Sequence, residues 1–143
     1  MVYKIMIPYS VRAVNCARAV VWADYARHRP EEFVQKLPKS VIPSVWYYFN
    51  EFKDFSEEKY RIRVMPFDVC NEYGFDQFPA GSNVYHRENL EALTRYCKVH
   101  IDPDKLLGMM QTPWKATVEA NRAALWECAE TIRAARAAFE AAE

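Results

Sequence analysis

Two short segments of the sequence combine residue types that could hold a small molecule. In the first, Pro8, Tyr9 and Ser10 follow an apolar, β-rich stretch at residues 2–7 and precede a stretch of helical periodicity. Open α/β sheets place ligands at the carboxyl ends of their strands, where the amides of the next helix start can hold a phosphate. Tyr9 could then stack on a nucleobase.

The second segment is a turn that leads into a helix and contains Ser82, Tyr85, His86 and Glu88. A carboxylate at a helix start is stabilised by the helix dipole, so Glu88 could serve simply as a capping residue. A role of this segment in a ligand site and a purely structural role are both open at this stage.

Other common kinds of site are absent from the sequence. The three histidines share no metal-ligand spacing, and the four cysteines form no CxxC pair, so a zinc site is not expected. Residues 68–79 superficially resemble a calcium loop, but the glycine comes one place late and the twelfth position is Pro79 rather than an acid. The three glycines form neither a Walker loop nor a dinucleotide-binding fingerprint. We expect no metal and no cofactor.

Composition narrows the class of protein. At 143 residues and 51% hydrophobic content the chain fits one globular domain, 1–143. Its 19 basic and 19 acidic residues cancel, so a nucleic-acid partner is not expected. The sequence shows no export signal and no apolar run of ~18 residues. We therefore expect a cytoplasmic protein, away from membranes, with reduced and buried thiols.

The periodicity predicts one α/β domain with a small parallel sheet and covering helices in residues 2–111, closed by a long C-terminal helix in residues 112–143. Residues 41–52 are apolar and aromatic, so they should be buried, as a strand or as a helix. The expected strands are 2–7, 60–65 and 98–101, the stretch 66–82 is expected to be rich in turns, and the expected helices are 10–28, 31–37, 88–97, 104–110 and 112–142.

The C-terminal helix carries a heptad seam, because two sets of residues seven apart alternate by four and three. Such a seam predicts a homodimer through this helix. The alternative, equally open, is that the helix only covers the sheet. The two sets are Val118, Leu125, Ile132 and Phe139, and Trp114, Asn121, Cys128 and Ala135.

Read together, the two segments belong to one spaced pattern: Ile7-Pro8-Tyr9-Ser10, Asn15, Arg18-Ala19, Cys70-Asn71-Glu72, Ser82, Glu88, Ala92 and Val99. Over residues 2–101 this pattern resembles the nucleoside 2-deoxyribosyltransferase-like proteins, small Rossmann-like domains of bacteria and phages. The sequence departs from the family at three places. Val84 replaces a glycine, Asn71 replaces an acid, and 96–98 replaces Gly-Lys-Pro. The resemblance also puts the central strand at 73–78 instead of 60–65.

The resemblance implies cleavage or exchange of the N-glycosidic bond of a nucleoside or nucleotide. Glu88 would be the catalytic residue, attacking the anomeric carbon or stabilising its oxocarbenium-like transition state. The remaining site residues would hold a phosphate or hydroxyl, stack on the base and orient Glu88. They are Pro8, Tyr9, Ser10, Ser82, Tyr85 and His86.

A second hypothesis keeps the scaffold but not the catalysis. On this interpretation the chain is an interaction protein, such as a phage-type inhibitor or accessory factor, that binds a protein partner or sequesters a nucleotide. A side chain at Val84 would hinder close approach of a phosphate and favours this hypothesis. The retained spacing from Ser82 to Glu88 favours the enzyme.

Overall fold

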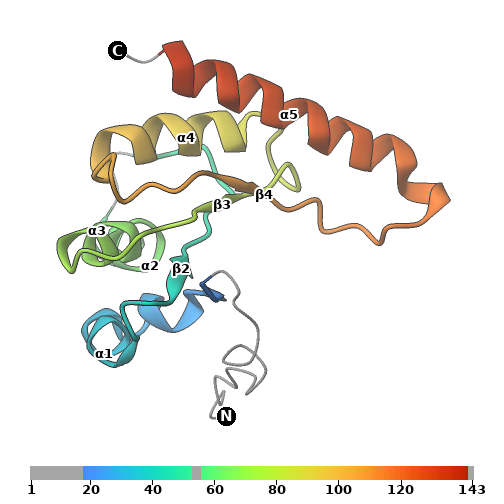
Figure 1. Cartoon of the computed structure of the whole chain (residues 1–143). Coiled ribbons are helices and arrows are strands. Elements are labelled where there is room, and N and C mark those ends of the chain that lie inside the picture. The colour runs from blue at the N-terminus through green and yellow to red at the C-terminus, as the bar shows by residue number, and fades with distance from the viewer. Residues whose placement is uncertain (1–17, 53–55, 142–143) are drawn as a thin grey trace.

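The computed structural model describes residues 18–52 and 56–141, which form two short pairs of parallel strands flanked by helices (Figure 1). Strand β1, Val20–Trp22, pairs with β2, Ile42–Ser44. Strand β3, Ala80–Gly81, pairs with β4, Met110–Gln111. Expected strand 2–7 and site residues Pro8, Tyr9 and Ser10 lie outside the described residues.

Hydrogen bonds join the two pairs into one parallel arrangement. The segment after β2 bridges to β3, because the amide of Ala80 donates to the carbonyl of Val45 at 2.9 Å and the amide of Tyr47 donates to the carbonyl of Ala80 at 3.1 Å. The strands therefore lie in the order β1-β2-β3-β4, the order in which they occur in the chain. The α/β class with small parallel sheets is confirmed. A Rossmann-like arrangement is not confirmed, since a doubly wound sheet reverses its strand order.

Every connection between consecutive strands passes through helix. Helix α1, Pro30–Lys36, links β1 to β2; helices α2, Glu57–Arg63, and α3, Met65–Glu72, link β2 to β3; helix α4, Asn89–His100, links β3 to β4. Helix α5, Arg122–Ala141, follows β4.

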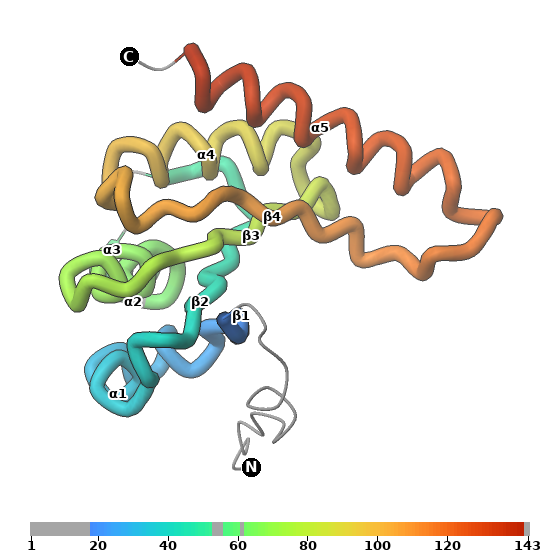
Figure 2. Tube along the Cα trace, viewed as in Figure 1, coloured from blue at the N-terminus to red at the C-terminus, as the bar shows by residue number. Residues whose placement is uncertain are grey.

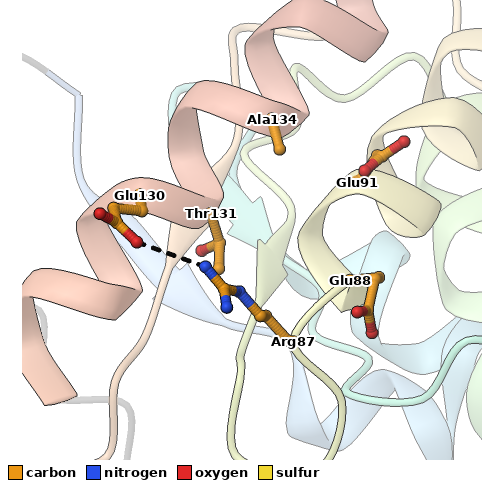
Figure 3. A pocket seen from close by; sticks show the side chains of 6 residues that line it. All are labelled: Arg87, Glu88, Glu91, Glu130, Thr131 and Ala134. Atoms are coloured by element: carbon orange, nitrogen blue, oxygen red, sulfur yellow. Dashed lines mark hydrogen bonds and ion pairs between the residues drawn. The ribbon is translucent and has the colours of Figure 1, made fainter.

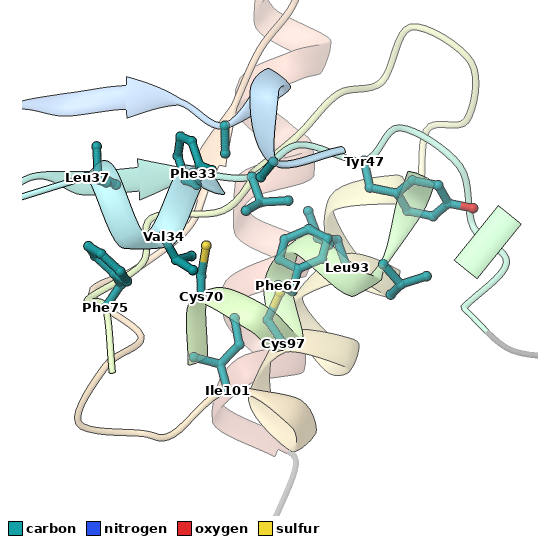
Figure 4. Close-up of a cluster of buried hydrophobic side chains, with 14 of the residues drawn as sticks. Phe33, Val34, Leu37, Tyr47, Phe67, Cys70, Phe75, Leu93, Cys97 and Ile101 are labelled. Carbon is teal, nitrogen blue, oxygen red and sulfur yellow. The ribbon is translucent and has the colours of Figure 1, made fainter. Parts of the chain in front are cut away.

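One core lies between the strands and α1, α3 and α4, whose buried side chains point toward one another (Figure 4). Phe67 of α3 has no exposed surface, and burying such a ring stabilises the fold by about 2–3 kcal/mol. Because residues of three helices and of the strands belong to this single cluster, the three helices cover the same face of the strands. Its main members are Phe33, Val34, Val45, Phe67, Cys70, Phe75, Leu93 and Cys97.

Two expected helices are confirmed. Helix α1 begins with Pro30, whose missing amide proton costs nothing in a first turn, and continues with Glu31 and Glu32 at the positive end of the dipole. Helix α4 buries Leu90, Leu93 and Cys97 on one side, as the spacing predicted. It continues to His100, however, so the expected strand 98–101 is wrong.

The expected strand 60–65 is also wrong, since these residues lie in α2 and at the start of α3. Ser56 caps α2 by accepting a hydrogen bond from the amide of Lys59 at 3.5 Å, and two glutamates follow it. Pro66 takes the first turn of α3, so the expectation of turns over 66–82 is wrong for α3. These local signals outweigh a six-residue alternation.

Three further expectations need correction. Residues 20–28 form β1 and a 3-10 helix, Asp24–Arg27, so the expected helix 10–28 is wrong over its later, described part. Residues 104–110 form turns that lead into β4 instead of a helix. The alternative central strand, 73–78, has only an isolated bridge at Gln77, and β3 comes later. The buried segment 41–52, left open before, contains β2.

The long C-terminal helix is confirmed, but it begins at Arg122 rather than at Thr112. Trp114 has a φ of 50°, in the left-handed region, which no helix continues through. A second 3-10 helix, Glu119–Asn121, precedes α5. None of the described helices combines the length and the apolar character needed to cross a membrane.

Helix α5 packs alongside α4 and runs in the same direction. Arg87, just before α4, forms an ion pair with Glu130 in the first half of α5 at 3.3 Å, and Lys98 near the end of α4 donates to the carbonyl oxygen of Phe139. Cys128 and Ala135, two of the four residues of one seam set, are buried, whereas Trp114 of the same set is exposed. The other set stays largely exposed, so the homodimer remains a prediction.

Candidate functional site: an aromatic cleft at the strand ends

A cavity of about 430 Å³ opens where the strands end, within the range that holds small ligands. Every strand contributes to it through the residues that follow its carboxyl end, and α2 closes one side. Because parallel strands bring these ends to one edge, residues far apart in sequence meet there. The lining residues are Arg27, Trp46, Tyr47, Tyr48, Phe49, Ile62, Arg63, Val84, Tyr85 and Trp114.

One wall of the cleft is a row of three aromatic rings. Trp46 stacks on Tyr48 with ring centroids 4.8 Å apart, and Trp114 meets Tyr48 edge-on at 6.1 Å. The indole of Trp46 donates to the carboxylate of Asp24 at 3.1 Å, which fixes the ring. Trp114 is 62% exposed at the end of the row, so its large apolar surface is open to a ligand.

A second wall is the pair Phe49 and Tyr85, whose rings stack at 5.2 Å with an interplanar angle of 15°. The buried side chain of Asn89 holds this wall to β3. Its amide donates to the carbonyl of Phe49 at 2.8 Å and its oxygen accepts from the amide of Ser82 at 2.9 Å. Tyr85 is 63% exposed and, like Trp114, presents its ring to solvent.

Two arginines supply positive charge. The guanidinium of Arg27 lies over the Trp46 ring and donates to the carbonyl of Trp46, and that of Arg63 lies 4.7 Å from the Phe49 centroid. Within residues 18–52 and 56–141 neither forms an ion pair with a carboxylate. Burial lowers the pKa of Arg27, and nearby Asp24 opposes that shift; an arginine nevertheless stays protonated. The cleft thus combines flat apolar surfaces with two guanidinium groups that form no ion pair with a carboxylate of the described residues.

The sequence predicted one residue of this cleft, Tyr85. His86 lies beside it, with its ring centroid 6.3 Å from that of Phe49. Ser82 is fully buried and joins neighbouring segments, since its hydroxyl donates to the carbonyl of Thr112 at 2.6 Å and accepts from the amide of Val84 at 3.1 Å. Its hydroxyl is engaged in holding the strands rather than open to a ligand.

Glu88 does not line the cleft. It is the exposed residue just before α4, makes no side-chain capping bond, and lines a shallow pocket of about 100 Å³ between α4 and α5 (Figure 3). That volume is below the range for a nucleoside. Two further carboxylates line the same pocket, where Arg87 pairs with Glu130. The pocket lining is Arg87, Glu88, Glu91, Glu130, Thr131 and Ala134.

The sequence reading missed Arg27, Trp46, Tyr48, Arg63 and Trp114. One signal was present. The aromatic run Trp46-Tyr47-Tyr48-Phe49 comes at the end of an apolar stretch. In parallel sheets, the loop that follows the carboxyl end of a buried strand often faces a ligand. The two arginines came from segments assigned to the wrong kind of element, so their convergence could not be foreseen.

The described part of the chain offers no group of three or more histidine, cysteine or acidic side chains arranged to hold a metal. Cys70, Cys97 and Cys128 are free thiols and buried, as expected. The chain matches no protein-family model, no curated protein and no solved structure. The resemblance to the deoxyribosyltransferase-like family therefore stays a prediction.

Proposed function

We propose that this protein binds a nucleotide, in the sense of an anionic small molecule with a flat ring, in the aromatic cleft. The observation that carries the proposal is the placement of Arg27 over Trp46 and of Arg63 over Phe49, with no ion pair to a carboxylate of the described residues, in a cavity of about 430 Å³ that Trp114 also lines. The same ligand class follows from the sequence resemblance, which shares only Tyr85 with this cleft.

The aromatic and the arginine side chains would bind different parts of the ligand. Stacking of a base on an aromatic ring is worth about 1–3 kcal/mol, and Trp114 and Tyr85 both present exposed rings for it. A guanidinium binds a phosphate through paired, charge-assisted hydrogen bonds. A ligand that carries both groups uses both features, whereas a neutral nucleoside or a bare phosphate uses only one.

Binding, and not bond cleavage, is the function that the cleft supports. Glu88 lies in a separate, smaller pocket, and Ser82 is buried in hydrogen bonds between strands. The proposal therefore follows one form of the second hypothesis from the sequence, an interaction protein that sequesters a nucleotide. Cleavage through Glu88 becomes a specific outcome to exclude.

Isothermal titration calorimetry with a panel of ligands tests the proposal. The panel comprises the nucleoside monophosphates, the matching nucleosides, ribose 5-phosphate and a neutral disaccharide. At least one monophosphate should bind about tenfold or more tightly than its nucleoside and than ribose 5-phosphate, because only it uses both rings and arginines. Equal or better binding of ribose 5-phosphate, or preference for the disaccharide, would contradict the nucleotide assignment.

The matched variants are Trp114→Ala and Trp126→Ala, since both tryptophans are exposed but Trp126 lies on α5 outside the cleft. We expect only Trp114→Ala to weaken binding. Chromatography of the same incubations for free base tests the enzymatic alternative. Base release that disappears in Glu88→Ala would mean that the protein cleaves the glycosidic bond. The proposal of binding without cleavage would then be wrong.

A further inference from the structure

In the part of the chain that the structure describes, the outer edge of strand β4 has no strand partner. Strand β4 pairs with β3 on its other edge. An open strand edge presents unpaired amide and carbonyl groups that can pair with a strand of another chain.

Helix α5 is incomplete on the same side. It meets α4 along the flank of Glu130 and Ala134, and it meets β4 where the Thr131 hydroxyl lies 2.8 Å from the side-chain amide of Gln111. At about 100° per residue, Leu125 and Ile132 lie on the flank turned away from Glu130 and Ala134. Ile132 is 50% exposed. Among the described residues, the outer edge of β4 thus has no strand partner, and Ile132 on this flank of α5 is half-exposed.

The opposite side of the molecule offers the complementary features. Strand β1 pairs only with β2 among the described strands. Its Val20 and Trp22 are 46% and 47% exposed, and Tyr25 in the following 3-10 helix is 45% exposed. Here too, within the described residues, the outer edge of a strand has no strand partner and apolar side chains beside it are exposed.

We propose that two copies of this chain pair through these sides, with β4 of each copy alongside β1 of the other, to close an eight-stranded parallel barrel. Figure 2 shows the basis of this proposal: the strands follow one another in order from β1 to β4, with the helices α1 to α4 outside them. The pairing is independent of the ligand in the cleft.

Three properties favour a second copy as the occupant. The four described strands of each copy give eight, the number at which parallel strands with outer helices close on themselves. A twofold axis along the barrel keeps all strands parallel and makes the same contact twice, in the commonest symmetry of protein dimers. Zero net charge leaves no overall repulsion between copies.

The first test is the mass of the full chain in solution, by sedimentation equilibrium over a concentration series. We expect twice the chain mass of 16.8 kDa. Ile132→Glu on the α5 flank and Trp22→Glu on β1 should each raise the dimer dissociation constant about 100-fold or more, because each buries an unpaired carboxylate. Trp126→Glu is the matched control, since Trp126 is 70% exposed on another side of α5; it should leave the dissociation constant unchanged.

Mixing the two variants separates this pairing from simple association of α5 helices. An equimolar mixture of Ile132→Glu and Trp22→Glu chains retains one intact contact of the two, so a dimer should reappear. A wild-type chain that stays monomeric, or a dimer that Ile132→Glu dissociates and Trp22→Glu does not, overturns the proposal. Circular dichroism verifies the fold, and Val20→Lys on the same strand replaces Trp22→Glu if that variant fails to fold.

Discussion

The guanidinium carbon of Arg27 lies 3.5 Å from the centroid of the Trp46 ring, so the residues that follow β1 and β2 are joined in one cation–π stack. Such a contact is worth about 0.5–2 kcal/mol. It also fixes where the charge of Arg27 stands at the mouth of the cleft. Structure and ligand binding are therefore coupled at this residue.

Replacing Arg27 by glutamine should lower the affinity for a nucleoside monophosphate by about 10- to 100-fold, because a charge-assisted pair with phosphate is lost. Calorimetry measures the change. Arg29→Gln is the control, since Arg29 is exposed and pairs with Glu32 at 3.4 Å outside the cleft. An Arg27→Gln protein that is folded and binds as tightly as the parent would remove Arg27 from the site.

Gly81→Ala should destabilise the protein by about 1–3 kcal/mol through overpacking. A β-carbon at Gly81 would lie 2.8 Å from the side-chain oxygen of Asn89 and 3.2 Å from the Leu90 backbone, so the contact of β3 with α4 must open. Urea unfolding gives the free energy. Gly74→Asn, at a left-handed position with open space around it, should change stability by less than about 1 kcal/mol; equal effects of the two substitutions would contradict the packing argument.

Stability should fall at alkaline pH in part through Tyr60. Its hydroxyl donates to the carboxylate of Asp68, which raises the pKa of Tyr60 to about 12. The folded chain then keeps a proton that the unfolded chain releases near pH 10. The contribution is complete below about pH 10 and is lost as pH rises toward 12. Unfolding free energies at about pH 9 and pH 11 should differ less in Tyr60→Phe than in the parent; an unchanged difference would show that the bond does not form.

Cys70 and Cys97 should resist alkylation in the folded protein. Burial raises the pKa of Cys70 to about 12 and raises that of Cys97 as well, and the thiolate is the reactive form. Iodoacetamide treatment followed by peptide mass spectrometry should find both unmodified until denaturant is added. Modification of either at the rate of a free thiol would mean that the core opens readily.

The parts of the fold that sequence predicted are those with strong local signals. Helices α1 and α4 combine a proper first turn with one apolar face, and both appear where expected. The strands are two or three residues long, too short for a period-two pattern to be recognised. The alternation of polar and apolar residues over 60–65 instead predicts a strand. Ser56 and Pro66, on either side of it, are residues typical of helix starts.

The site was harder to predict than the fold. Its residues come after four different strands and from α2, so finding them requires knowing which segments are neighbours. Tyr85 was found because it lies next to a recognisable helix start. The heptad spacing predicts Trp114 in a helix seam, whereas its left-handed backbone, φ 50°, keeps it out of α5 and its ring meets Tyr48 in the cleft.

The sequential order of the strands also bears on how the chain folds. Each strand pairs with the strand next in sequence, but a helical connection separates the paired residues, as in Val20 with Ile42 and Ala80 with Met110. Closing such a connection costs entropy before the strands pair, so we expect this chain to fold more slowly than a helical bundle of the same size. During synthesis each β/α unit can settle on the unit that left the ribosome before it, and α5 completes the fold last.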